Sequence, residues 1–120
     1  MKNDPPLLSA TELLALYRSR RISPVEVTQA CLDRIAAADA RFNAFTLVDG
    51  DAAMESARAS EERWLKGKPL GLVDGVPATI KDLLLTKGWP TLRGSRAISP
   101  DQPWEEDAPA TARLREQGAI

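Results

Sequence analysis

Apolar residues recur every three to four positions along three stretches of the chain, a spacing that predicts amphipathic helices. A fourth helix is expected between a capping Asp107 and a C-terminal Gly118. Two of the three stretches open with a capping box, in which a serine precedes the helix and a glutamate follows three residues later. Ser9 is paired in this way with Glu12, and Ser23 with Glu26. The expected helices cover residues 10–20, 24–38, 51–66 and 108–116. Residues 1–8 are expected to form a mobile arm that docks late, before the first helix.

The second expected helix has a clear buried face. Val27, Cys31 and Ile35 repeat at a spacing of four residues along it. Cys31 is interpreted as a core residue rather than a nucleophile, because no basic neighbour is evident in the sequence to lower the pKa of its thiol. Trp64, near the end of the third helix, is expected to anchor that helix onto a sheet.

Two shorter stretches have the pattern of a β-strand. Residues 44–48 are rich in β-branched and aromatic side chains. Residues 76–81 place apolar side chains at every second position. Together with the helices these strands predict an α/β fold. The length of 120 residues is enough for one domain with a modest core.

The second strand ends in two charged residues. Residues 75–82 read GVPATIKD, so Lys81 and Asp82 close an otherwise apolar run. Burial disfavours the ammonium form of a lysine, and a lysine at the end of a buried strand can therefore become a base. Two structural alternatives stay open from these residues alone: Lys81 pairs with a carboxylate, or it extends its ammonium group to water.

Composition narrows the classes of function. Sixteen basic and seventeen acidic residues give a net charge of −1, which does not indicate nucleic acid or a membrane surface as a partner. The sequence has neither a transmembrane run nor a secretory signal pattern, and its single cysteine is compatible with the cytoplasm, which is the expected location. There is no histidine, which excludes a Ser-His-Asp triad or a histidine-built metal site within these residues.

Residues 75–82, together with residues 88–95, which read GWPTLRGS, resemble the N-terminal part of amidase signature enzymes. The resemblance extends over essentially the whole chain and is most specific in residues 75–95. It implies an α/β/α fold with a mixed β-sheet flanked by helices. Residues 1–120 would be the incomplete N-terminal portion of a single domain with this fold.

Enzymes of this family use a serine nucleophile, a second serine in a cis peptide, and a lysine as the base. The resemblance implies that Lys81 is the catalytic lysine and that both serines lie beyond the end of this sequence. Asp82 would orient the neighbouring loop or balance local charge. A threonine-x-x-glycine-serine pattern would help to hold the active site, and it comprises Thr91, Gly94 and Ser95. The plain alternative for Ser95 is a Gly-Ser turn, and Ser95 is not the candidate nucleophile.

The implied activity is hydrolysis of carbon–nitrogen bonds other than peptide bonds in a small amide substrate, through an acyl-enzyme and without a metal or cofactor. One alternative is the glutamine-hydrolysing A subunit of a tRNA-dependent amidotransferase, which would bring a protein partner and tRNA. The other is a non-enzymatic helical interaction module. The 120 residues alone are expected to be inactive, with a homodimer through the unpaired strand edges as one expected response.

Overall fold

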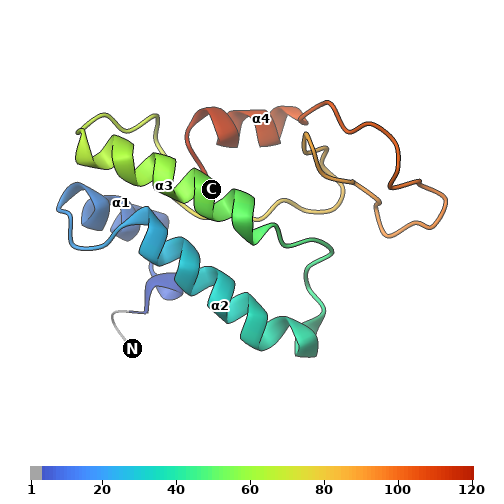
Figure 1. Ribbon diagram of the computed structural model, residues 1–120, viewed down its shortest axis with the longest axis horizontal. Helices are drawn as coiled ribbons and strands as arrows, with labels where there is room; N and C mark the ends of the chain where they lie inside the picture. Colours follow the sequence, from blue (N-terminus) through green and yellow to red (C-terminus); the bar gives the residue numbers. More distant parts are fainter. Residues whose placement is uncertain (1–3) are drawn as a thin grey trace.

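The computed structural model describes residues 4–120, which contain one 3₁₀-helix, η1 (Pro5–Leu7), and four α-helices. The α-helices are α1 (Ala10–Arg18), α2 (Pro24–Phe42), α3 (Gly50–Leu65) and α4 (Pro109–Glu116). α2 and α3 pack side by side, and a long segment without regular structure connects α3 to α4 (Figure 1). Among residues 4–120, no helix is both long and apolar enough to cross a membrane.

The capping boxes form as the sequence predicts. The hydroxyl of Ser9 accepts a hydrogen bond from the backbone N–H of Glu12 at 3.3 Å, and the Glu12 carboxylate accepts one from the backbone N–H of Ser9 at 2.8 Å. Ser23 and Glu26 make the same two bonds at 3.2 and 2.8 Å. Each box satisfies two of the backbone donors that a helix start leaves unpaired, which fixes where α1 and α2 begin.

The arm predicted over residues 1–8 is structured where it is described, while residues 1–3 lie outside the described residues. Pro5–Leu7 forms η1, which packs on α2. Asp4 forms an ion pair with Arg34 of α2. Residues 4–8 are therefore docked, held against α2 by local turn formation and this ion pair. The expected mobility and late docking of the arm stay predictions.

A small core joins the first three α-helices. Leu13 and Tyr17 of α1, Val27 of α2 and Ala57 of α3 are its buried apolar residues. Trp64 of α3 packs against this core with its ring 5.8 Å from the ring of Tyr17. Trp64 therefore anchors α3 onto α1 rather than onto a sheet, which corrects the expectation from the sequence.

The expected strand at residues 44–48 is wrong, since no strand forms among residues 4–120. α2 continues past its expected end and stops where Asn43 adopts a left-handed φ of 48°. The Asp39 carboxylate then accepts hydrogen bonds from the backbone N–H groups of Ala44 and Phe45, at 2.7 and 3.2 Å. Capping the helix in this way uses the backbone donors that a strand would offer to a neighbour.

The expected strand at residues 76–81 is wrong for a different reason. The segment runs without helix or turn from residue 76 to residue 81, but it has almost no backbone partner. The N–H of Ala78 donates to the carbonyl of Ile120 at 2.7 Å, and the N–H of Ile120 donates to the carbonyl of Val76 at 3.0 Å. Strands need a neighbouring backbone along their length, and here only the last residue offers one. The mixed sheet expected for the α/β fold is therefore not formed within residues 4–120.

Cys31 lies on the inner face of α2, where it packs against the buried core and is half-buried. Burial raises the pKa of its thiol, and this effect outweighs the opposing influence of Arg34. We expect a thiol reagent to label Cys31 slowly in the folded chain and much faster in denaturant, because the thiolate is the reactive form. The measurement is the rate of absorbance change with a chromogenic disulfide. Equal rates in the two conditions would contradict a packed Cys31.

Candidate active site

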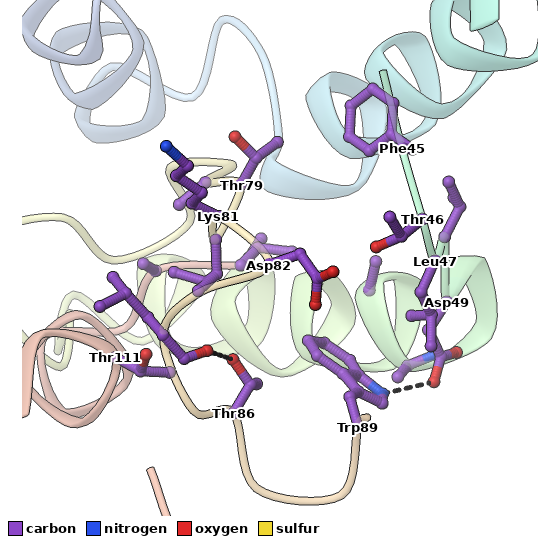
Figure 2. Close-up of a pocket in the computed structure, with 18 of the residues that line it drawn as sticks. Phe45, Thr46, Leu47, Asp49, Thr79, Lys81, Asp82, Thr86, Trp89 and Thr111 are labelled. Carbon is purple, nitrogen blue, oxygen red and sulfur yellow. Dashed lines mark hydrogen bonds between the residues drawn. The ribbon is translucent and has the colours of Figure 1, made fainter. Parts of the chain in front are cut away.

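An open groove of about 270 Å³ lies between α2, α3 and α4. Helices and irregular segments both contribute apolar side chains, and most of the polar ones come from the irregular segments. Its lining includes Leu32, Ile35, Phe45, Leu47, Ala52, Ala53, Ile80, Lys81, Asp82, Thr86, Trp89, Thr91, Thr111 and Leu114. Figure 2 shows Lys81, Asp82 and Trp89 among the side chains around it. The two charged residues that end the GVPATIKD stretch thus lie at this groove.

Lys81 is exposed, and its side chain makes no hydrogen bond or ion pair within residues 4–120. Its ammonium group points away from the carboxylate of Asp82 (Figure 2). The burial expected for Lys81 is therefore not found. Of the two structural alternatives, pairing with a carboxylate is not seen among residues 4–120, and extension of the ammonium group to water agrees with the exposed side chain. Its exposure follows from the missing sheet, since no neighbouring strand covers the end of residues 76–81.

Asp82 is turned the other way and holds the loop that follows. Its carboxylate accepts hydrogen bonds from the backbone N–H of Leu92 at 2.9 Å and from that of Gly94 at 3.4 Å. Arg93, between them, has a left-handed φ of 55°, and Gly94 has a φ of 67°. A non-glycine residue in that region carries a conformational cost. The carboxylate helps to offset this cost by binding both flanking N–H groups.

The remaining residues of the threonine-x-x-glycine-serine pattern make hydrogen bonds of their own, and none of these bonds is to Lys81. Thr91 is buried, and its hydroxyl donates to the carbonyl of Leu84 at 3.4 Å. Ser95 is exposed, and its hydroxyl accepts a hydrogen bond from the backbone N–H of Ala97 at 3.2 Å. The structure therefore brings Asp82 and Gly94 together. It gives Ser95 the local turn contact of the plain Gly-Ser alternative.

Trp89 closes the groove on the side of α3. Its indole N–H donates to the Asp49 carboxylate at 3.1 Å (Figure 2). The other oxygen of the same carboxylate caps α3 by accepting from the backbone N–H of Ala52 at 3.0 Å. One side chain thus fixes both the start of α3 and the loop that bears Trp89. No group of three or more His, Cys, Asp or Glu side chains that could hold a metal ion occurs in the described part of the chain.

Sequence reasoning missed a buried polar cluster at the start of the Lys81 segment. Asp74 is fully buried, and both of its carboxylate oxygens are used. They accept from the Arg63 guanidinium at 2.8 and 2.7 Å, from the Ser60 hydroxyl at 2.7 Å and from the backbone N–H of Leu70 at 2.6 Å. We call Ser60, Arg63 and Asp74 the Asp74 anchor.

The electrostatics of this cluster favour the ion pair. Burial by itself raises the pKa of the Asp74 carboxyl, but the hydrogen bonds from Arg63, Leu70 and Ser60 outweigh it and hold that pKa below its ordinary value of 3.8. The hydrogen bonds that Arg63 donates to Asp74, aided by the charge of that carboxylate, raise the pKa of Arg63. The forked, bidentate geometry fixes the orientation of the carboxylate as well as its charge. The sequence gives little sign of this cluster, because its members lie on α3 and in a later loop without a shared spacing.

Comparison with known proteins places the chain in a family. The family model described as Amidase matches residues 26–120. The glutamyl-tRNA(Gln) amidotransferase A subunit of Salinispora arenicola (strain CNS-205) is 46% identical over 113 residues, which cover 94% of this chain and 23% of that protein. An amidase of known structure is 36% identical with a TM-score of 0.84, over 94% of this chain and 25% of its own. A bacterial aryl acylamidase of the amidase signature family is 30% identical with a TM-score of 0.86, over 94% and 24%.

These matches define the class of protein: the chain belongs to the amidase signature family. It spans about a quarter of the length of the relatives that it matches. The relatives of known structure are α/β enzymes, whereas residues 4–120 here are helical with irregular connections.

Proposed function

We propose that this chain is the N-terminal part of an enzyme that hydrolyses amide carbon–nitrogen bonds, with Lys81 as the catalytic base. We call the longer protein implied by this proposal the complete enzyme. The observation that carries the proposal is the position of Lys81. It is the next-to-last residue of a GVPATIKD stretch in an amidase signature chain. It lies at a groove, with its ammonium group exposed and unpaired among the described residues.

The proposed chemistry is acyl transfer to a serine supplied by the rest of the complete enzyme. Lys81, in its neutral form, accepts a proton through the second serine, and the nucleophilic serine attacks the amide carbonyl. Backbone N–H groups stabilise the oxyanion, and the proton returns to the nitrogen that leaves as ammonia or an amine. Water then attacks the acyl-enzyme and releases the carboxylic acid.

Asp82, Thr91, Gly94 and Ser95 have supporting roles in this proposal. The Asp82 carboxylate binds the backbone N–H groups of Leu92 and Gly94. These bonds fix the loop and also hold Asp82, the neighbour of Lys81, in a defined orientation. Thr91 holds the base of the same loop through the carbonyl of Leu84. We assign no chemical step to any of the four.

A second candidate is the glutamine-hydrolysing component of a tRNA-dependent amidotransferase. It is supported by the 46% identity to a protein named as the A subunit of a glutamyl-tRNA(Gln) amidotransferase. The same lysine chemistry would then release ammonia from glutamine, and a protein partner and tRNA would be needed. The two candidates share Lys81 and differ in the acyl donor.

The test is to express the complete reading frame that contains residues 1–120 and assay two substrates. We expect release of the amine from a simple aryl or aliphatic amide without any added partner. Ammonia release from glutamine, with no turnover of simple amides, would favour the second candidate. A reading frame that stopped at residue 120, or a folded complete protein that turned over neither substrate, would overturn the proposed activity.

A further inference from the structure

The backbone at residues 74–75 is fixed from several sides at once. Besides the Asp74 anchor, the carbonyl of Asp74 accepts from the indole N–H of Trp64 at 3.1 Å. The next carbonyl, of Gly75, accepts from the buried hydroxyl of Tyr17 at 2.9 Å, and the N–H of Gly75 donates to the carbonyl of Gly118 at 2.9 Å. α1, α3 and the residues after α4 therefore converge on two consecutive peptide units.

The surroundings of Gly75 leave no room for a side chain. Its φ is +85°, and an added Cβ would lie 2.8 Å from the hydroxyl of Ser60 and 2.9 Å from a ring carbon of Pro24. A Cβ atom cannot lie so close to other heavy atoms, and a left-handed φ also favours glycine. The path of the chain as it leaves residue 75 is thus determined by the packing around it.

The segment that carries Lys81 is held far less tightly. Ala78, Thr79 and Lys81 are exposed. Its backbone ties to the residues after α4 are the two hydrogen bonds that Val76 and Ala78 make with Ile120. The next fixed point along the chain is Asp82, which holds the loop at residues 92–94. The orientation of Lys81 therefore depends on the anchors at the two ends of its segment.

We propose that the Asp74 anchor is a positioning device for Lys81, a role that rests on the function proposed above. The guanidinium of Arg63 and the hydroxyl of Ser60 fix the Asp74 carboxylate on α3. The carboxylate in turn fixes the direction in which the extended segment leaves the helical core. The anchor takes no part in proton transfer, so its effect on catalysis is through the geometry of Lys81.

The first test measures amide hydrogen–deuterium exchange in the 120-residue chain. Arg63→Lys keeps the charge but removes the bidentate fork. We expect it to speed exchange on the order of tenfold at the amides of Gly75, Ala78 and Ile120, which pair the segment with the residues after α4. Amides in the middle of α2 are expected to exchange as in the unchanged chain. The matched control is Glu62→Gln, also on α3, which removes only an exposed ion pair with Lys66.

The second test measures steady-state kinetics in the complete enzyme. Arg63→Lys is expected to lower kcat by roughly 10- to 100-fold with KM nearly unchanged, because a displaced base slows the chemical step without altering substrate binding. Ser60→Ala removes one hydrogen bond to Asp74 and should lower kcat less. It serves as the milder variant if Arg63→Lys does not fold.

The two tests separate the possible failures. Faster exchange throughout α2 as well as at the three reporter amides would show a general loss of stability and overturn the positioning role. Local exchange changes with an unaltered kcat in an active complete enzyme would also overturn it. A complete enzyme without activity would instead contradict the proposed function, and the exchange experiment would still decide whether the anchor fixes the segment.

Discussion

Replacing Lys81 by alanine in the complete enzyme is expected to lower kcat on the order of 10²- to 10⁴-fold, the range that a positioned acid–base group contributes. The substitution removes the only group proposed to accept the proton of the serine relay. The fold should be little changed, because the Lys81 side chain is exposed and makes no hydrogen bond or ion pair among residues 4–120. The measurement is turnover of a simple amide, with circular dichroism to confirm the fold.

Two further variants sharpen this experiment. Lys81→Arg should be as inactive as Lys81→Ala, since a guanidinium stays protonated in proteins and cannot act as a base. Lys87→Ala is the matched control, because Lys87 is an exposed lysine in the turn that follows the same segment. Near-normal turnover by Lys81→Arg would show that a residue other than Lys81 is the base.

The helices could be predicted because their signals are local. A capping box involves residues three apart, and both boxes fix a helix start in the structure. The end of α2 was harder to place, since it depends on the conformation of Asn43 and on the Asp39 side chain that binds the next two N–H groups. Helix ends are set by a few such competing contacts, which the apolar pattern does not describe.

The strands could not be placed because a strand is defined by its neighbour. Residues 76–81 have the right alternation, but only Ile120 lies beside them as a backbone partner. The same reasoning explains Lys81: the sequence pattern predicts burial, and burial would require a strand next to it. The homodimer expected from unpaired strand edges stays a prediction. The extended backbone of residues 76–81 is the place where such an edge would form.

Only the residues of the candidate site that are adjacent in the sequence could be predicted. Lys81 and Asp82 stand out because charged residues end an apolar run, and the Asp82 carboxylate does hold the loop that contains Gly94. The Asp74 anchor was missed because Ser60 and Arg63 read as ordinary polar positions on α3. Only the folded chain reveals that both side chains turn inward to a carboxylate eleven or more residues away. Long-range polar contacts of this kind have no period in the sequence.

The 120 residues by themselves are expected to show no amide hydrolysis. A lysine can act as the base of an acyl transfer only if it can take a proton from a nucleophile. Among residues 4–120 the side chain of Lys81 makes no hydrogen bond, to a serine hydroxyl or to any other group. The sequence also holds no histidine that could act as a substitute base. The measurement is release of a chromogenic amine by the purified chain, compared with buffer and with its own Lys81→Ala variant.

The opposite outcome would be equally informative. Hydrolysis by the 120-residue chain that disappeared in Lys81→Ala would mean that a nucleophile lies within these residues. Ser95 would then be the first to replace, because it follows the loop that Asp82 holds and its hydroxyl is exposed. Ser99→Ala is the control. If Ser95→Ala lost activity and Ser99→Ala kept it, the mechanism would use a pair, Ser95 and Lys81, in place of the proposed triad. Without such activity, the proposal that the serines of the triad come from the rest of the complete enzyme stands.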